Sequence, residues 1–216
     1  MKNINLSSKK RIKIINHKHG SQKKLSKKYD EILSEIKKEI KDKNKKLNVL
    51  KKNFQFNFNF QDLKKFQKYK TVVLIGMGGS ILGAEAIYNF LKVKIKKKFY
   101  FINDLNEEKT NDLKKKENFS KILFIIVSKS GNTIETITNT FALKIIRKNS
   151  KNVIIISEKK DNLLYSLSKK LNLFYIEHKG SIGGRFSVLS EVGMVPAYFM
   201  GVKVKKLRSN ILDFFK

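Results

Sequence analysis

The sequence predicts a doubly wound α/β fold: a five-stranded parallel sheet with helices on both faces, preceded by an N-terminal helical extension. From residue 71 onward, five short apolar segments alternate with helix-length segments. Strands that are apolar throughout are typical of a parallel sheet covered on both faces. The loops richest in glycine and hydroxyl groups follow these apolar segments, and ligands bind to parallel sheets at that edge.

The first 70 residues have a different pattern. Between residues 21 and 50, apolar side chains recur at three- and four-residue spacing, which predicts an amphipathic helix; they are Leu25, Tyr29, Ile32, Leu33, Ile36 and Ile40. Phenylalanines at 54, 56, 58 and 60 then alternate with Asn and Gln, which predicts a strand or extended segment with one aromatic face. We interpret this face as packing on the neighbouring domain rather than stacking on nucleic-acid bases.

The elements of the sheet domain follow in order. The expected strands are 71–75, 99–102, 122–127, 152–156 and 173–176. The helices expected between them are 81–91, 106–117, 133–148 and 162–170. We therefore divide the chain into a basic helical extension (1–70), an α/β domain (71–201) and a final segment (202–216).

The chain carries 48 basic and 18 acidic residues, a net charge of +30. Such an excess normally indicates a polyanionic partner. Only four of the 48 are Arg, the residue expected for bidentate contacts with bases and phosphates. With frequent Asn and Ile and a single Pro, the Lys excess is typical of AT-rich coding, which we favour over nucleic-acid binding.

Cysteine is absent, which excludes disulfides and cysteine metal sites and fits a reducing compartment. Neither a signal peptide nor an apolar run long enough to cross a bilayer is predicted. We expect a cytoplasmic protein with no membrane partner.

A first glycine-rich loop, Gly-Met-Gly-Gly-Ser at 76–80, follows the first strand. Glycines let the backbone approach a ligand, and the next helix directs free N–H groups toward it. This is not a dinucleotide fingerprint, because Ile81 stands where the third glycine belongs. The loop is either a ligand loop or a tight connection in which Ser80 only caps the helix.

The second loop, Ser-Lys-Ser-Gly-Asn-Thr at 128–133, follows the third strand. Its three hydroxyls and the N–H groups at a helix start can surround the oxygens of a phosphomonoester. Each hydrogen bond to a charged group contributes about 1.5–3 kcal/mol, so several would hold a sugar phosphate. The loop lacks the ending of a Walker motif. We favour phosphate binding over the alternative, a Ser/Thr-rich helix cap.

The third loop, Gly-Gly-Arg-Phe-Ser at 183–187, follows the last strand. It presents Arg185, one of the four arginines in a chain that otherwise uses Lys. A fixed guanidinium can stabilise negative charge on a reacting oxygen. The alternative is a structural arginine that binds backbone carbonyl groups.

Taken in order, the three loops, with the second extended to Ile134-Glu-Thr136, closely resemble the glucose-6-phosphate isomerase family. They are similar to its first sugar-isomerase (SIS) domain, a flavodoxin-like fold. The resemblance covers residue 71 to the end, and the N-terminal helix is similar to the family's helical lead-in. It implies an aldose–ketose isomerase of glycolysis and gluconeogenesis that interconverts glucose 6-phosphate and fructose 6-phosphate. It also implies no metal or cofactor, and a homodimer when complete.

The resemblance further implies a role for each motif residue. In it, Arg185 lies near the enediolate intermediate and Ser80 reaches the phosphate side of the substrate. Glu135 matches an acidic position that lines the pocket, and equally suits a first-turn acid that complements the helix dipole. The residues expected to contact the substrate or hold its phosphate are Gly79, Ser80, Gly184, Ser128, Ser130, Thr133 and the backbone of Lys129.

Two features depart from the family pattern. Residues 130–132 read Ser-Gly-Asn where many members have Thr-Phe-Thr, which leaves the sugar specificity open. Proton transfer between C1 and C2 needs a base, and the family's Glu, His and Lys lie in a second SIS domain. His17, His19 and His178 match no such motif. We therefore expect a front-half fragment, inactive alone, whose residues 202–216 lead toward the missing domain.

Two other functions stay open. One is a non-catalytic SIS module that binds a sugar phosphate, for instance as a sensor. The other is a nucleic-acid-binding protein that uses the Lys-rich arm, whose affinity would fall steeply with salt.

Overall fold

The computed structural model describes residues 19–209 and Ile211. The chain divides into two compact units, Met1–Lys38 and Glu39–Lys216. Residues 39–70 thus belong to the same unit as the sheet. The boundary that we placed after residue 70 coincides with the start of the first strand. The basic arm with His17 lies outside the described residues.

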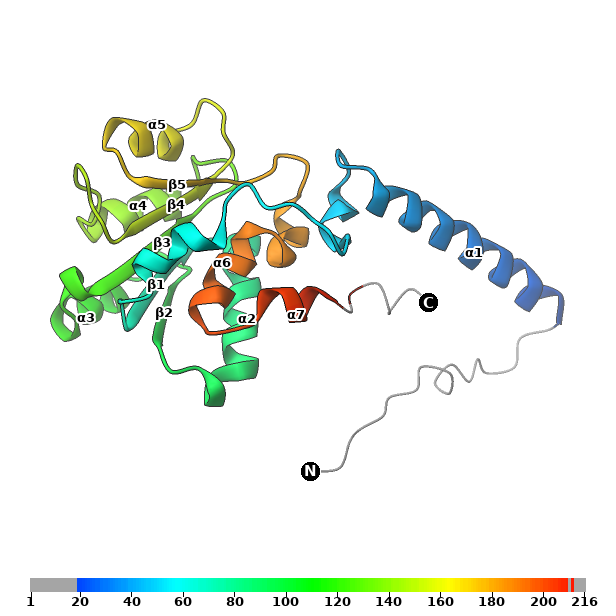
Figure 1. Cartoon of the computed structure of the whole chain (residues 1–216), viewed down its shortest axis with the longest axis horizontal. Coiled ribbons are helices and arrows are strands. Elements are labelled where there is room, and N and C mark those ends of the chain that lie inside the picture. Colours follow the sequence, from blue (N-terminus) through cyan, green and yellow to red (C-terminus); the bar gives the residue numbers. More distant parts are fainter. Residues whose placement is uncertain (1–18, 210, 212–216) are drawn as a thin grey trace. The chain divides into compact units, whose positions relative to one another are not determined.

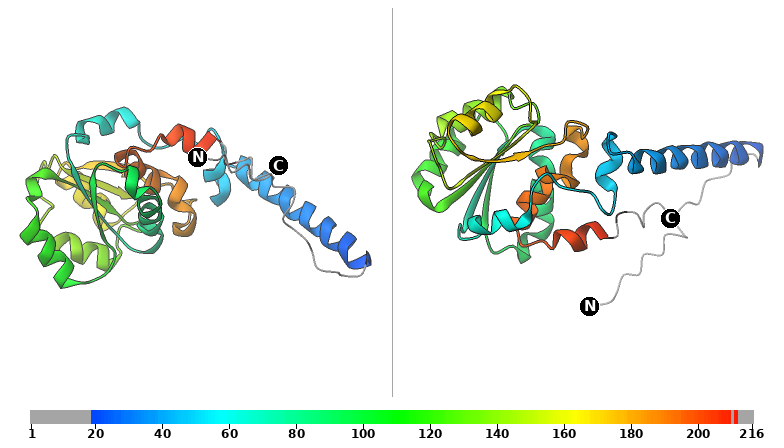
Figure 2. Two further views of the ribbon diagram at one scale, coloured as in Figure 1. Left: turned by 90° about the horizontal axis from the view of Figure 1, so that it is seen from below. Right: turned by 45° about the horizontal axis from the view of Figure 1, so that its top comes forward.

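The second unit is built on five parallel strands in the order β2-β1-β3-β4-β5. The strands are β1 (Thr71–Gly76), β2 (Lys98–Ile102), β3 (Ile122–Val127), β4 (Val153–Ser157) and β5 (Phe174–Glu177). All five predicted strands are confirmed to within two residues at each end. The central residues of β1, β3 and β4 are fully buried because helices cover both faces of the sheet, as Figures 1 and 2 show.

The helices connect the strands in the predicted alternation. They are α1 (His19–Lys41), α2 (Leu82–Leu91), α3 (Glu107–Lys116), α4 (Ile134–Ala142), α5 (Leu163–Lys170), α6 (Glu191–Phe199) and α7 (Val204–Ser209). Short 3₁₀ helices are η2 (Lys46–Leu50), η3 (Phe60–Phe66), η4 (Gly78–Ser80), η5 (Lys92–Lys94), η6 (Phe119–Lys121) and η7 (Gly184–Leu189). No described helix is both long and apolar enough to cross a membrane.

Two helix boundaries differ from the sequence expectation. The helix expected over 133–148 ends at Ala142, because the chain turns at Lys144, whose φ is +53°. Left-handed residues commonly end helices, and the turn lets Leu143 and Ile145 enter the core. The helix expected over 21–50 likewise ends at Lys41, before a turn and η2.

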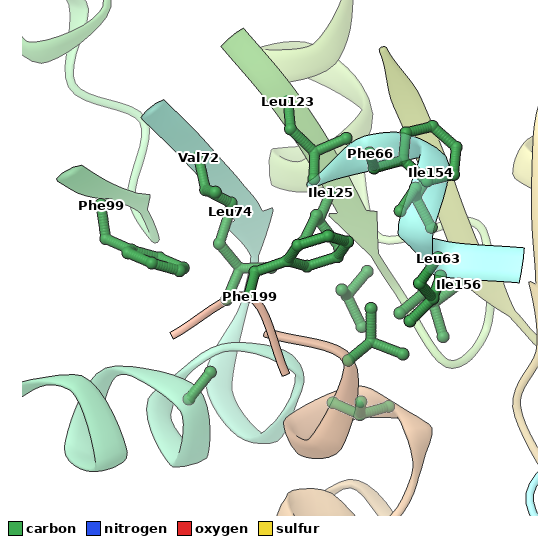
Figure 3. Packing of buried hydrophobic residues seen from close by; sticks show 14 of the residues in the cluster. Leu63, Phe66, Val72, Leu74, Phe99, Leu123, Ile125, Ile154, Ile156 and Phe199 are labelled. Atoms are coloured by element: carbon green, nitrogen blue, oxygen red, sulfur yellow. The ribbon is translucent and has the colours of Figure 1, made fainter. Parts of the chain in front are cut away.

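Alternate residues of each strand enter two separate apolar clusters. On one face, β1 and β3 residues such as Leu74 and Ile125 pack with Phe66 of η3, α2 and Phe199 of α6 (Figure 3). On the other face, their neighbours pack with α3, α4 and α5 through Leu113, Leu143 and Leu164. This two-sided burial makes the domain doubly wound, as predicted.

The aromatic segment 54–60 packs within the second unit. Phe54 is buried against Val49 and Ile182, and the following phenylalanines are half-buried while the Asn and Gln between them are exposed. The segment is not a strand of the described sheet: it bends at Asn57 and Phe58, and Phe60 begins η3. One aromatic face laid on the domain is therefore confirmed.

Candidate functional site

The candidate site lies at the carboxyl edge of the sheet, where the strand order reverses. β1 pairs with β2 on one side and with β3 on the other, and Gly76 ending β1 is the register partner of Val127 ending β3. The first and second loops thus leave the sheet side by side, and the helices that follow them cover opposite faces. In parallel α/β sheets, ligands bind at this switch point.

Three hydroxyl groups converge in the second loop. Ser128 Oγ lies 2.8 Å from Thr133 Oγ1 and 3.5 Å from Ser130 Oγ, and the latter two atoms are 3.4 Å apart. Ser128 is buried, Thr133 half-buried and Ser130 exposed, so the group extends from the interior to the surface. Hydroxyl groups this close together can donate to the oxygens of a single anion.

Backbone donors lie beside the same hydroxyls. The N–H groups in the first turn of α4 have no intrahelical acceptor. Within the described residues, the N–H groups of Lys129, Ser130 and Thr133 donate no hydrogen bond. Thr133 is the N-cap of α4, yet its side chain makes no capping bond and contacts Ser128 instead. The side chain of Thr133 therefore does not serve as the cap of α4.

The shape of the second loop depends on Gly131 and Asn162. Gly131 has φ +70°, and a Cβ there would lie 1.8 Å from Asn162 Oδ1. Asn162 is held in turn, since its Nδ2 donates to the Glu158 carbonyl at 2.8 Å. Leu164 N donates to the Gly131 carbonyl at 3.2 Å. Sequence reasoning missed Asn162, because nothing local links it to a loop about 30 residues earlier.

The ammonium group of Lys129 contacts two other loops and not the three hydroxyls. Its Nζ donates to the Gly180 carbonyl at 2.8 Å and lies 3.4 Å from Glu158 Oε1. Glu158 also pairs with Lys160. Burial alone would raise the pKa of Glu158, but the two lysines outweigh it and hold that pKa below its ordinary value. Lys129 can therefore face a ligand through its backbone, as expected from the sequence.

The first and third loops touch through their backbones. A Cβ at Gly79 would lie 2.2 Å from the carbonyl oxygen of Gly184, so only glycine permits this approach. The Ser187 hydroxyl donates to the Gly79 carbonyl at 2.9 Å and to the Gly184 carbonyl at 2.6 Å. With the second loop beginning beside the first, all three loops lie at one edge of the sheet, as predicted.

The side chains of Ser80 and Arg185 are not used by the fold. The N-cap of α2 is Ile81, and the half-buried Ser80 makes no side-chain hydrogen bond to the described residues. Arg185 is exposed and has no hydrogen bond or ion pair within the described part of the chain. The structural arginine is Arg208, which is buried and binds the carbonyls of Leu189, Val49 and Lys51.

Glu135 is a carboxylate near the second loop without an ion pair to the described residues. It lies half-buried in the first turn of α4. Two other nearby carboxylates are engaged, Glu158 as above and Asp104 with Lys109 at 2.7 Å. Glu135 is thus placed to complement the helix dipole or to accept a proton.

A separate groove of about 910 Å³ shares no residue with the three loops. Aromatic and aliphatic side chains of the 54–60 segment, α6 and α7 line it, including Phe56, Phe60, Tyr198 and Val204, with lysines at its rim. The convergence of polar groups is therefore at the sheet edge and not in this groove.

The strand order, with these three loops at the switch point, defines a flavodoxin-like α/β domain. The family model for phosphoglucose isomerase matches residues 2–208. The chain belongs to the phosphoglucose isomerase family.

Curated relatives have the same family name. The chain is 35% identical over 163 residues to a glucose-6-phosphate isomerase of Methanocaldococcus jannaschii, covering 74% of this chain and 40% of the relative. It is 40% identical over 141 residues to that of Borreliella afzelii, covering 60% and 26%. A probable glucose-6-phosphate isomerase of Methanococcus maripaludis is 32% identical over 216 residues, covering 85% and 49%. The chain spans half or less of the length of these relatives.

Solved structures share the fold. A hypothetical protein from Thermus thermophilus has a TM-score of 0.70 at 22% identity, covering 88% of this chain and 48% of that one. A glucose-6-phosphate isomerase from Chlamydia trachomatis has a TM-score of 0.56 at 24% identity, covering 70% and 29%. Both likenesses support the α/β architecture.

Proposed function

We propose that this chain supplies the sugar-phosphate-binding part of a glucose-6-phosphate isomerase, an aldose–ketose isomerase that interconverts glucose 6-phosphate and fructose 6-phosphate. The observation that carries the proposal is the gathering of three loops at the switch point, with hydroxyl and N–H donors unoccupied in one loop and Arg185 unpartnered in another. The glucose-6-phosphate isomerases among its relatives support the choice of substrate. The family resemblance also supports a cytoplasmic homodimer for the complete protein.

Phosphate recognition falls to the second loop. The hydroxyls of Ser128, Ser130 and Thr133 donate to the phosphate oxygens, together with the N–H groups of Lys129 and Ser130. The first turn of α4 adds its partial positive charge. Ser80 extends this recognition from the first loop, next to the start of the second.

The isomerisation moves a proton between C1 and C2 through an enediolate. Negative charge develops on the oxygen of the substrate carbonyl, and a nearby guanidinium stabilises it. We assign this role to Arg185. A Cβ at Gly184 would meet nothing nearer than Gly79 Cα at 4.0 Å, so the sugar can approach the backbone closely there.

The proton itself needs a base within hydrogen-bond reach. The three loops contain no carboxylate, and Glu135 is our candidate among those beside them. The family resemblance assigns the base to a Glu outside these 216 residues. The same observation favours a second candidate function for this chain, a sugar-phosphate-binding module without turnover.

A binding and turnover experiment tests the proposal. The chain is titrated with inorganic phosphate, glucose 6-phosphate and glucose, while the amide NMR signals of residues 128–135 are followed. We expect the two phosphates to shift these signals and glucose to leave them unchanged. Binding of neither phosphate, or an equal response to any polyanion including DNA, contradicts the proposal.

Conversion of glucose 6-phosphate to fructose 6-phosphate is measured in parallel. We expect binding without conversion, because no residue here matches the proton-transferring Glu that the family resemblance implies. Conversion that is lost in Glu135→Gln would assign the base to this chain and exclude the binding-module alternative.

A further inference from the structure

The third loop is the middle of a segment that connects β5 to α6. A buried residue stands at each end of this segment. His178 follows β5, and its N–H still donates to the Ser157 carbonyl of β4 at 2.8 Å. Glu191 is the first residue of α6. The two side chains are 1% and 0% exposed, and between them lie residues 179–190, which carry Gly184 and Arg185.

His178 and Glu191 close the base of this segment, and we call the pair the clasp. His178 Nδ1 lies 2.9 Å from Glu191 Oε1, and the N–H of Lys179 donates to the same oxygen at 3.0 Å. The other ring nitrogen, Nε2, faces the Ile182 carbonyl at 3.2 Å. The clasp therefore joins α6 to the start of the segment and fixes its first turn.

Both ring nitrogens of His178 face oxygen acceptors. Nδ1 contacts the Glu191 carboxyl group and Nε2 contacts the Ile182 carbonyl. The clasp therefore joins α6 to residues 178, 179 and 182 through buried polar contacts.

Other charged groups surround Glu191. Burial lowers the pKa of Arg208 in α7 to about 10, although the nearby Glu191 carboxylate acts to raise it. The N-terminus of α6 adds partial positive charge at Glu191. The ammonium of Lys179 is directed elsewhere, to the Gln55 carbonyl at 2.6 Å. Glu191 Oε2 is buried and has no hydrogen-bond partner within the described residues.

Burying polar and charged side chains costs free energy, and a pair of apolar residues of similar size often stabilises a fold at least as much. The best-attested use of buried polar pairs is to select one arrangement of the chain over others. Here the arrangement selected is the path of residues 179–190, which places Gly184 against Gly79.

We propose that His178 and Glu191 are positioning residues that hold the Arg185 loop against the first loop. This inference rests on the proposed function only for the role of Arg185; the clasp itself is tested without it.

The first test measures hydrogen exchange at amides inside and outside the segment. The amides of Ile182 and Phe186 donate to the Lys179 and Gly183 carbonyls and report the segment; the amides of β3 report the sheet. In Glu191→Gln and in His178→Gln we expect the segment amides to exchange about tenfold faster, because one charged hydrogen bond is lost, with β3 unchanged. Glu177→Gln removes the same charge one residue before His178, outside the clasp, and serves as the control.

Three outcomes overturn the clasp. The first is unchanged exchange in both variants, and the second is equal acceleration of every amide, which indicates general destabilisation. If both variants fail to fold, nitrogen NMR of the wild-type ring decides: a proton on Nδ1 supports the hydrogen bond to Glu191, and a ring protonated at Nε2 alone overturns it.

The second test asks whether the clasp acts through Arg185. The ligand is a sugar-phosphate analogue with a carboxylate where the enediolate oxygens would form, compared with inorganic phosphate. We expect Arg185→Ala to weaken analogue binding about tenfold in the wild-type background and less than threefold when Glu191→Gln is already present, since a loosened loop no longer presents the guanidinium. Phosphate affinity should stay within about twofold in Glu191→Gln.

The outcomes separate the two proposals. Equal Arg185→Ala effects in both backgrounds overturn the positioning role. If wild type binds neither ligand, the proposed function fails, while the exchange measurements still decide whether the clasp holds the segment.

Discussion

Replacing Thr133 by Ala separates phosphate recognition from folding. The change removes Oγ1, which lies 2.8 Å from the buried Ser128 Oγ and 3.4 Å from Ser130 Oγ. Ser128 Oγ keeps the bond from Gly131 N at 3.1 Å, so no buried group is orphaned. The stability lost is then that of one ordinary hydrogen bond, about 1 kcal/mol.

Phosphate binding should suffer more than stability. A hydrogen bond to a charged group contributes about 1.5–3 kcal/mol, and about 1.4 kcal/mol corresponds to a tenfold change in affinity. We expect Thr133→Ala to weaken inorganic phosphate and glucose 6-phosphate alike by about tenfold, measured by calorimetric titration. Urea unfolding gives the stability in parallel.

Thr138→Ala is the matched control. Thr138 lies exposed on the same helix, and its side chain makes no hydrogen bond to the described residues. It should bind phosphate as the wild type does. Wild-type affinity in Thr133→Ala, or an equal loss in both variants, would show that the hydroxyls of the second loop do not hold the phosphate.

Three further predictions follow from the structure. Arg185→Lys keeps the charge but loses the planar fork, so affinity for a carboxylate analogue of the enediolate should fall about tenfold while inorganic phosphate competes as before; parallel losses would make Arg185 a phosphate ligand. Gly131→Ala forces a side chain onto Asn162 at a φ of +70° and should cost about 2–4 kcal/mol in urea unfolding, whereas Gly180→Ala, with only a 3.6 Å contact, should cost little. The pKa of Glu158 is lowered by its lysine partners against the opposing effect of burial. Its ion pairs therefore stabilise the chain at pH values above the ordinary pKa of Glu. This stabilisation is lost as the pH falls through the lowered pKa. The stability gap between wild type and Glu158→Gln should therefore narrow on acidification, and a constant gap contradicts this.

The strands and the site loops were predictable because their signals are local. β3 is apolar over its whole length and mostly β-branched, and the observed bounds, Ile122–Val127, equal the predicted ones. Loops 76–80, 128–133 and 183–187 carry their chemistry within five or six consecutive residues. Parallel topology then places all of them at one edge.

The contacts between loops were not predictable. Asn162 fits beneath Gly131, and Glu191 reaches back to His178, across separations that no periodicity marks. Helix α6 was missed for another reason: all but one of its residues are buried, so it has no polar face and no amphipathic period to detect. The helix predicted over 133–148 was too long because the chain turns at Lys144 in the left-handed conformation. Lysine is a residue type that rarely adopts this conformation.

The close approach of the first and third loops means that their glycines differ in whether the fold leaves room for a side chain. At Gly79 any side chain collides with the Gly184 carbonyl, so tolerance to change there is set by the chain's own atoms. The relation is one-sided, because a Cβ at Gly184 would meet nothing nearer than Gly79 Cα at 4.0 Å, and one at Gly183 only the ring of Phe186 at 3.5 Å. The fold has room for alanine at both of the latter positions. In a mutational scan, losses at 79 report folding, whereas losses at 183 and 184 report the space that a bound molecule occupies.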